Sequence, residues 1–297
     1  MQLRIRTDEP IMDDRMKLMA SITDFWDKTS LAWRTIWGPH LHHGYYEDKL
    51  SFTPVQAQEN MIEKILHILE LPRQMKILDV GCGMGGSSLY LAKNVAAHVT
   101  GITLSKKQLA MAVQQSLEDN VKNVTFEIDD ALTLSKFADE SFDVIWSLES
   151  CEQFYDKNLF IKQAFRVLKP GGKFMLATWC SDRDEYQGKS ASQYKNLCLA
   201  FDLPYMPTID SYQRSLEMQN FEVNQVFDWS ANVKQSWDIG LSLVNAYSFI
   251  NLIRLTGFRA FRAVKQLQMM RDAFRYGRVK YGIFFSTKPQ YTYDLKL

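Results

Sequence analysis

The sequence predicts an α/β fold in which helices cover both faces of a parallel β-sheet. Strand-like apolar runs alternate with helix-like segments from residue 75 to residue 180, as in consecutive βαβ units. The first run, Ile77 to Val80, breaks into Gly81, Gly83 and Gly85 before a helical pattern begins. Glycine permits a positive φ and a close approach of a ligand to the main chain. We therefore expect a ligand at this turn, where the first strand meets its helix.

The segments before the sheet are predicted to be helical. Residues 1–9 are polar, and we expect them to be disordered. From Met12 to Trp26 apolar residues recur at helical spacing, which predicts an amphipathic helix. Thr53 to Gln56 form a capping box with proline at the first helical position, so a second helix should run to about Leu69.

The segments beyond Pro207 are predicted to complete the sheet. We expect a helix over residues 210–219, a strand over residues 221–228 and a last strand over residues 279–285. About 50 residues separate those two strands, and one helix among them carries an apolar stripe at the 3.6-residue period. Such a stripe is first a packing surface, but it also suits a lid over an apolar substrate. The stripe consists of Ala260, Ala263, Val264, Leu267, Met270 and Phe274.

The residues after the glycine-rich turn narrow the class of cofactor. Gly81, Gly83 and Gly86 also satisfy the loose dinucleotide pattern. A dinucleotide site has an acidic residue about 20 positions further on, at the end of the second strand. That place holds Thr103, Leu104 and Ser105, and the last of these begins a second capping pattern. The turn therefore predicts a nucleotide-like cofactor other than a dinucleotide.

Four core segments, taken in order, resemble the class I S-adenosylmethionine-dependent methyltransferases. They are residues 77–88, Asp129 to Ala131, Ser141 to Ser147 and Val167 to Gly172. Three further segments are similar to the γ-tocopherol methyltransferase family, which includes plant alkaloid N-methyltransferases and bacterial natural-product enzymes. They are Phe25 to Asp27, Trp37 to Tyr46 and Tyr276 to Phe285, and the resemblance spans roughly residues 20–288.

The resemblance implies a Rossmann-like fold with a seven-stranded, mostly parallel sheet. N-terminal helices precede this sheet, and a helical cap is inserted before its last strand. The implied division is residues 1–52 for the N-terminal helices and covering loop, residues 53–230 for the cofactor-binding core, residues 231–277 for the cap, and residues 278–297 for the last strand and tail.

The implied cofactor is S-adenosyl-L-methionine, with S-adenosyl-L-homocysteine as product. The residues expected to bind it lie at strand ends or in segments that cover them. They are Trp26, Tyr45, Asp79, Gly81, Gly83, Gly85, Thr103, Leu104, Gln108, Asp130, Ala131, Ser147 and Glu149.

The candidate catalytic residues are His42, His43, Glu149 and Glu152. A base is needed only if the acceptor loses a proton. We expect Glu149 to lie near the sulfonium or a cationic intermediate, where its charge offsets positive charge, although a carboxylate at a strand end also serves as a structural hydrogen-bond partner. The expected acceptor-binding residues are His40, Gln153, Trp179, Trp237 and Phe258, and Gln153 stands where relatives commonly have histidine.

The histidine-rich loop from His40 to His43 also invites a metal interpretation, which we set aside. Zinc sites recruit three or four ligands, with cysteine or carboxylate partners, and no second cluster is visible in the sequence. We expect no metal.

The composition bounds the partners and the compartment. The chain has 297 residues, 46% hydrophobic residues and a net charge of +1, which gives no support to a nucleic-acid partner. Four cysteines form no CxxC pair and no signal peptide or membrane-spanning run is visible, so we expect the reducing cytoplasm. Residues 231–280 nevertheless carry nine Lys and Arg against two Asp. This basic cap is either a solvated helix face or a peripheral contact with anionic membranes.

The resemblance implies methyl transfer to carbon or nitrogen of a lipophilic small molecule, such as a tocopherol-, indole-, alkaloid- or prenyl-like natural product. One alternative is N-methylation of a small polar amine of the sarcosine or dimethylglycine type. Another is a non-catalytic module that binds the cofactor. The sequence leaves the oligomeric state open, including a homo-oligomer.

Overall fold

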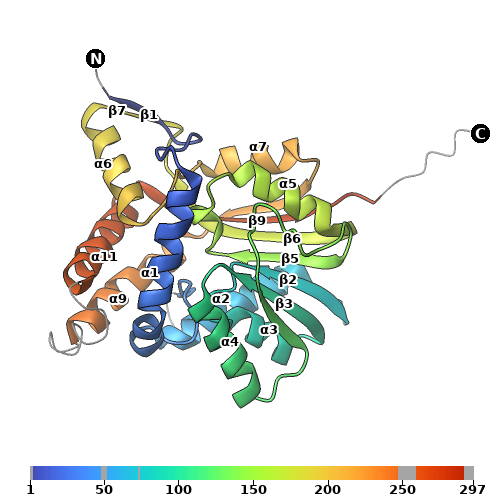
Figure 1. Cartoon of the computed structure of the whole chain (residues 1–297). Helices are drawn as coiled ribbons and strands as arrows, with labels where there is room; N and C mark the ends of the chain where they lie inside the picture. The colour runs from blue at the N-terminus through green and yellow to red at the C-terminus, as the bar shows by residue number, and fades with distance from the viewer. Residues whose placement is uncertain (1–2, 48–51, 73, 247–258, 291–297) are drawn as a thin grey trace, which may run out of the picture.

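The computed structural model describes residues 3–47, 52–72, 74–246 and 259–290. A seven-stranded sheet with the order β4-β3-β2-β5-β6-β9-β8 forms its centre (Figure 1). Pairing is parallel from β4 to β6, and β9 is antiparallel to both of its neighbours. The predicted α/β fold with a mostly parallel sheet is confirmed. The strands are β2 (Met75–Val80), β3 (Ala97–Thr103), β4 (Val124–Ile128), β5 (Phe142–Leu148), β6 (Leu168–Ser181), β8 (Glu222–Asp228) and β9 (Val279–Thr287).

The helices predicted from capping residues begin where those residues stand. In α2 (Pro54–Leu69) the side chain of Thr53 accepts from the Gln56 N–H, and the Gln56 side chain accepts from the Thr53 N–H. In α4 (Lys106–Glu118) the Ser105 hydroxyl accepts from the Gln108 N–H. The helix α7 (Ile209–Met218) also lies where the pattern placed it.

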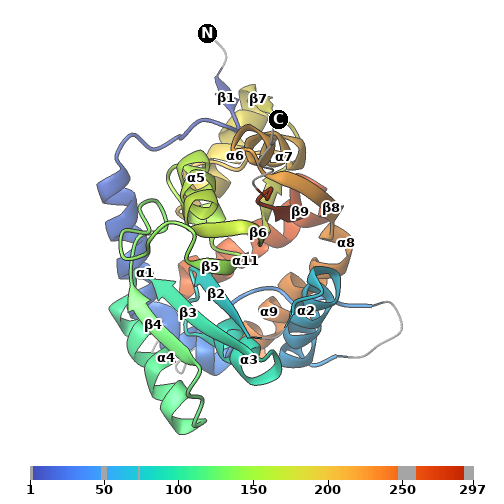
Figure 2. The same cartoon turned by 90° about the vertical axis from the view of Figure 1, so that its right-hand side faces the viewer.

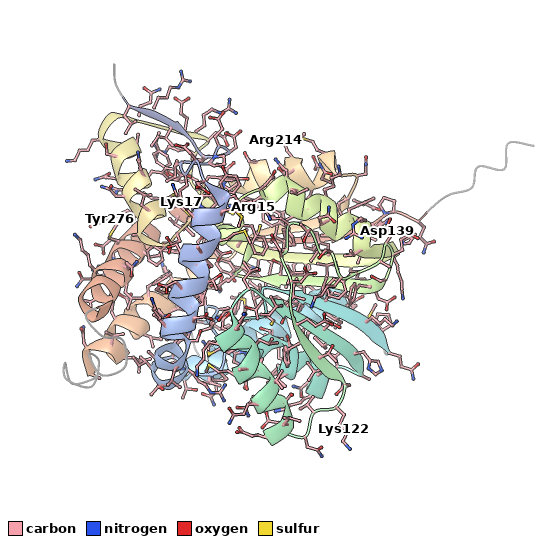
Figure 3. The ribbon with its side chains drawn as sticks, viewed as in Figure 1. Arg15, Lys17, Lys122, Asp139, Arg214 and Tyr276 are labelled. Atoms are coloured by element: carbon pink, nitrogen blue, oxygen red, sulfur yellow. The ribbon has the colours of Figure 1, made fainter. Side chains whose placement is uncertain are left out.

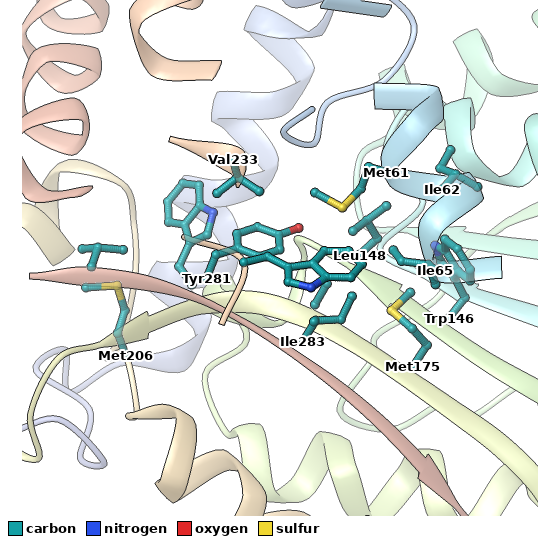
Figure 4. Close-up of a cluster of buried hydrophobic side chains, with 14 of the residues drawn as sticks. Met61, Ile62, Ile65, Trp146, Leu148, Met175, Met206, Val233, Tyr281 and Ile283 are labelled. Carbon is teal, nitrogen blue, oxygen red and sulfur yellow. The ribbon is translucent and has the colours of Figure 1, made fainter. Parts of the chain in front are cut away.

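Two apolar clusters cover the two faces of the sheet, because successive strand residues point to opposite sides. One joins the strands to α5 (Lys157–Val167) and α7, and the other joins them to α2, α3 (Gly86–Asn94) and the helices of the cap. Figure 2 shows these helices on opposite sides of the twisted sheet. Figure 4 shows part of the second cluster, where Tyr281 and Ile283 of β9 lie with Trp146 and Leu148 of β5.

The N-terminal segment corrects one expectation. Residues 4–6 form the strand β1 (Arg4–Arg6), which pairs antiparallel with β7 (Glu185–Gln187). Arg4 forms an ion pair with Glu185, and the Gly188 N–H donates to the Leu3 carbonyl at 2.7 Å. Polar residues are compatible with such a two-stranded ribbon, because its stability comes from main-chain pairing rather than from burial.

The first helix, α1 (Arg15–Ile36), runs ten residues past the predicted end at Trp26. Figure 1 shows it crossing the side of the molecule between the sheet and the cap. The helix α6 (Gly188–Ala200) has no counterpart among the predicted elements, yet it buries Tyr194, Leu197 and Cys198 in the core.

The cap contains α8 (Ser230–Val233), α9 (Gln235–Ala246) and α11 (Arg259–Arg275). On the predicted stripe of α11, Leu267, Met270 and Phe274 are buried and Val264 packs against them, whereas the side chains of Ala260 and Ala263 lie outside the described part. From Val264 to Phe274, the stripe is therefore a packing surface. Beyond the helix, Tyr276 lies exposed at the edge of the molecule (Figure 3).

Candidate active site

A cavity of about 430 Å³ opens at the carboxyl ends of β2, β3 and β5. The glycine-rich turn, α1, the loop around His42 and the cap enclose it. Ligands bind at this edge of an open parallel sheet, where the strand order reverses beside the first strand. Gly81, Thr103, Asp130 and Glu149, each of which follows or ends a predicted strand, line this cavity together.

The glycine turn keeps the main chain open toward this cavity. Gly81 has a φ of 80° and Gly83 a φ of 55°. A Cβ on Gly81 would lie 2.3 Å from the Cβ of Ser150, and one on Gly83 would lie 3.0 Å from Leu41. Gly85 differs, because its Cβ would meet Phe126 and Ala112 of the protein core rather than the cavity. These contacts show that Gly85 allows the turn to pack closely against β4 and α4, and Gly85 is not among the residues that line the cavity.

The end of β3 forms a polar corner of the cavity. The Thr103 hydroxyl donates to Oε1 of Gln108 at 2.8 Å, and it accepts from the Ser105 N–H at 3.2 Å. Asp27 of α1 reaches this corner and accepts from the Ser105 hydroxyl and from the Lys107 N–H. The first turn of α4 is thus capped by a residue from α1, which holds that helix over the turn.

Two aspartates at strand ends differ in their partners. Asp79 is buried and accepts from the Ser88 hydroxyl at 2.6 Å, and burial raises the pKa of its carboxyl to about 7. Asp130 forms an ion pair with Arg15, and its other oxygen accepts from the Leu132 N–H at 2.9 Å. Figure 3 shows Arg15 at the start of α1.

The carboxylate of Glu149 accepts hydrogen bonds from three protein donors. It accepts from the main-chain N–H of His43 at 2.8 Å, from Nδ1 of His43 at 2.6 Å and from the hydroxyl of Tyr281 at 2.8 Å. Burial raises the pKa of Glu149, but the charge and hydrogen bonds of His43 outweigh burial and hold the pKa below its ordinary value. Its φ of 54° is left-handed, a strained conformation that clusters at functional sites.

The neighbouring His42 has a different environment. Its Nδ1 lies 2.8 Å from the His43 carbonyl, which can only accept, so Nδ1 carries the proton. Nε2 is buried and has no partner, and burial lowers the pKa of the ring. His40, whose Nδ1 is also without a partner, has a pKa lowered to about 3 by burial. The side chain of Gln58 fixes this loop by donating to the carbonyls of both His40 and His42.

Glu152 lies one turn beyond Glu149, in the short helix η1 (Cys151–Gln153). It is buried, and the hydroxyl of Thr178 donates to its Oε2 at 3.0 Å. Burial, with the nearby charge of Glu149, raises the pKa of Glu152 to about 8. Lys157 donates to the main-chain carbonyl of Glu152 rather than to its carboxyl group. Glu152 therefore holds a proton at neutral pH and is poorly suited to accept another.

Aromatic rings form the opposite end of the cavity. The centroids of Trp179 and Trp237 lie 5.6 Å apart, and each contacts Phe201. The ring of His43 packs against both tryptophans, at 5.9 and 4.9 Å. The indole nitrogens of both are buried without a partner. This end can enclose an apolar ligand.

Most of the predicted residues line this cavity. These are Trp26, His40, His42, His43, Asp79, Gly81, Gly83, Thr103, Leu104, Gln108, Asp130, Glu149, Glu152, Gln153, Trp179 and Trp237.

Four predicted residues do not line the cavity, and the structure gives them other contacts. Tyr45 packs on Trp229 at 4.8 Å. Ala131 is buried among apolar side chains, and Ser147 pairs with the Ser150 hydroxyl at 3.0 Å. Gly85 packs against the core as described above. Phe258 lies outside the described residues.

Sequence reasoning missed Tyr281, Gln58 and Phe201 as parts of the site. Tyr281 stands in the last strand, about 130 residues from its partner Glu149. Its sequence position signals only a core strand, because the antiparallel pairing of β9 with β6 brings it to the site.

Within the part of the chain that the structure describes, no three His, Cys, Asp or Glu side chains come together as a metal site. No helix there combines the length and apolarity that a membrane span requires. All four cysteines are free and buried.

Comparison with known proteins identifies the family. A model described as a methyltransferase domain matches residues 71–236. The chloroplastic tocopherol O-methyltransferase of Arabidopsis thaliana is 33% identical, over 92% of this chain and 83% of the relative. The 2-methyl-6-phytyl-1,4-hydroquinone methyltransferase of Synechocystis sp. is 31% identical, over 92% of this chain and 88% of the relative. Among solved structures, the cyclopropane synthase MmaA2 of Mycobacterium tuberculosis shares the fold, with a TM-score of 0.79, 20% identity and coverage of 91% and 98%.

The fold and the site therefore define a class I S-adenosylmethionine-dependent methyltransferase. Within that class, the chain belongs to the tocopherol methyltransferase family.

The cavity fits S-adenosylmethionine better than a phosphorylated nucleotide. Its described lining includes no Lys or Arg, but it includes the carboxyl groups of Asp130 and Glu149, and the pKa of Glu149 is below its ordinary value. Phosphates are commonly held by Lys and Arg, whereas a sulfonium is a cation that carboxylates stabilise. Thr103, Gln108 and Asp130 would hold the adenosine half, and the glycine turn leaves room for the methionine half.

Proposed function

We propose that this enzyme transfers a methyl group to carbon or nitrogen of a lipophilic small molecule. The observation that carries the proposal is a single cavity with two chemically different ends. The polar corner at Thr103 suits the cofactor, and the aromatic end at Trp179 and Trp237 suits an apolar acceptor. When bound, S-adenosylmethionine supplies a methyl group already activated on a sulfonium. The protein has mainly to align the acceptor and exclude water, and alignment contributes about 7 to 11 kcal/mol in well-oriented systems.

Two relatives support a lipophilic acceptor. The Arabidopsis relative is named for a tocopherol and the Synechocystis relative for a phytyl hydroquinone. A small polar amine remains an alternative acceptor, but it would leave the wall of Trp179, Phe201 and Trp237 without an apolar partner. A non-catalytic module that only binds the cofactor is a second alternative. Such a module would not need the aromatic end of the cavity, so this alternative leaves that end unexplained.

The cofactor half of the proposal is tested by calorimetric titration with S-adenosylmethionine. Gly83→Val should abolish binding, because a branched side chain would enter the cavity from a residue with positive φ. Gly171→Val is a matched control, since Gly171 also has a positive φ, 75°, but lies near Gln290 and away from the cavity. Unchanged affinity in Gly83→Val would refute the placement of the cofactor. Loss of affinity in both variants would show a general effect of strain.

We also propose a reversible contact between the basic cap and anionic membranes, through which a lipid-soluble acceptor enters. Its support is the excess of seven positive charges over residues 231–280. Three bases there are paired with acids, in the pairs Arg271–Asp272, Arg275–Asp238 and Lys280–Asp228. These pairs reduce the field available to lipids. Sedimentation with anionic vesicles at low salt should carry down the protein, and neutral vesicles should not. Protein that stays in the supernatant with both would refute the contact.

A further inference from the structure

The hydrogen bonds of His43 distinguish it from the other candidate bases. Glu149 is ionised at neutral pH because its pKa is below its ordinary value, so its oxygens can only accept. Nδ1 of His43, 2.6 Å from Oε2 of Glu149, therefore carries a proton. In a neutral ring, the lone pair is then on Nε2.

The surroundings of His43 place that ring beside the acceptor. Its centroid lies within 6 Å of Trp179, Trp237, Phe274 and Tyr281, and the two tryptophans line the aromatic end of the cavity. His42 also lines the cavity, but no carboxylate is hydrogen-bonded to its ring, and burial opposes its charged form. Glu152 already holds its proton at neutral pH. A base must stabilise the proton that it takes, and His43 alone of these three is paired with an ionised carboxylate.

We propose that His43, oriented by Glu149, accepts the proton that the acceptor loses, and that Tyr281 positions Glu149 for this task. In this step the bond between the methyl carbon and sulfur breaks as the acceptor bonds to that carbon, and sulfur keeps the electron pair. The proton released by the acceptor moves to Nε2 of His43. The carboxylate of Glu149 then stabilises the imidazolium by its charge without taking the proton, as in a catalytic triad. This inference rests on the proposed methyl transfer.

Tyr281 has a specific part in this arrangement. Its hydroxyl donates to Oε1 of Glu149, the same oxygen that accepts from the His43 N–H, so the carboxylate is held by donors from two segments. Its own N–H donates to the Ser230 hydroxyl at 2.8 Å, which fixes β9 at this point. Tyr281 is a positioning residue, because it acts on the acceptor only through Glu149 and His43.

The kinetic test compares His43→Gln, Glu149→Gln and Tyr281→Phe. We expect His43→Gln to lower kcat by about 10² to 10⁴. Tyr281→Phe should lower kcat about tenfold, the effect of one lost hydrogen bond. The Kd for S-adenosylmethionine should stay within about twofold in His43→Gln and Tyr281→Phe, because these two residues act on the acceptor. The double variant of His43 and Glu149 should lower kcat no more than His43→Gln alone, because the two residues act as one unit.

Tyr212→Phe is the matched control for Tyr281→Phe. Tyr212 is equally buried, but its hydroxyl faces Cys151 in the cluster beneath the other face of the sheet. We expect unchanged kcat for this control. A full kcat in His43→Gln, or a larger loss in His42→Gln than in His43→Gln, would overturn the assignment.

A second readout needs no turnover. In the ligand-free protein with ¹⁵N-labelled histidine, NMR should show a downfield, exchange-protected proton on Nδ1 of His43. It should be absent in His43→Gln and move upfield in Glu149→Gln, because a neutral amide is a weaker acceptor than a carboxylate. A proton on Nε2 with Nδ1 bare would contradict the proposal. If this signature is present but no acceptor is methylated, the proposed function fails and the His43–Glu149 geometry stands.

Discussion

Nε1 of Trp26 on α1 donates a hydrogen bond to Oε1 of Gln153, 3.0 Å away in the wall of the cavity. The amide nitrogen of the same Gln153 donates to the carbonyl of Phe201 at 3.2 Å. Gln153 therefore joins α1 to the aromatic wall of the cavity. An amide is not basic at neutral pH, and both ends of this one are hydrogen-bonded to protein, so Gln153 is a structural link rather than a base.

Replacing Gln153 should remove its hydrogen bonds to Trp26 and to Phe201. Gln153→Leu leaves the indole of Trp26 and the carbonyl of Phe201 unpaired, and we expect the free energy of unfolding to fall by about 1 to 3 kcal/mol. Gln153→Glu should lose more stability, because it places a partly buried negative charge in η1, four residues from Glu149. Urea denaturation measures both losses. Gln153→Leu with wild-type stability would show that the bridge is not maintained in solution.

Asp130 can act in two ways: it can bind the cofactor directly, or it can hold α1 in place through its ion pair with Arg15. If Asp130 accepts a hydrogen bond from the adenine amino group, Asp130→Ala should weaken binding of S-adenosylmethionine by about 1.5 to 3 kcal/mol. Arg15→Met removes the ion pair but keeps the carboxylate, so it should weaken binding less. Calorimetry compares the two variants. Equal losses would mean that Asp130 acts on the cofactor only by holding α1.

Gly83 and Gly85 should respond differently to alanine although both have a positive φ. In Gly85→Ala the new Cβ would lie 2.8 Å from Phe126 and 2.9 Å from Ala112, so the stability loss should exceed the 1 to 2 kcal/mol or so of left-handed strain. Gly83→Ala meets only the flexible end of Leu41 at 3.0 Å. We expect the lower Tm in Gly85→Ala and the weaker cofactor binding in Gly83→Ala. The reverse order would contradict the division of roles between these glycines.

The raised pKa of Glu152 predicts a pH-dependent stability. Its pKa is about 8 in the folded protein against an ordinary value of 4.5, so the folded state binds more protons between these values. Stability should therefore fall as pH rises from about 5 and through about 8. Glu152→Gln removes the titration and retains an acceptor for Thr178. Urea denaturation at pH 6 and pH 8.5 should show a smaller difference for the variant than for the wild type. Equal differences would refute the buried, protonated Glu152.

Much of the fold could be predicted because local signals were strong. The capping residues Thr53 and Ser105 and the glycines of the first turn each determine local geometry, and the helices begin at those residues. The β1–β7 ribbon and α6 could not be predicted in this way. Their strand pairing and burial depend on partners far along the chain, and they carry no periodic signal of their own.

The candidate site shows the same limit. Strand ends such as Thr103 and Glu149 could be placed, because all parallel strands end at one edge of the sheet. The sequence treated His42 and His43 alike, and only the contact with Glu149 separates them. Tyr281 and Gln58 escaped notice because their roles depend on packing between segments that are distant in sequence.

Methyl transfer itself is the central claim, and one measurement tests it directly. The protein is incubated with methyl-labelled S-adenosylmethionine and a panel of quinols, prenyl compounds, indoles, aromatic amines and sarcosine, with and without EDTA, and products are analysed by mass spectrometry. We predict one added methyl on a lipophilic member, together with S-adenosylhomocysteine, and no effect of EDTA. Methylation of sarcosine alone, or cofactor binding without transfer to any member, would contradict the account.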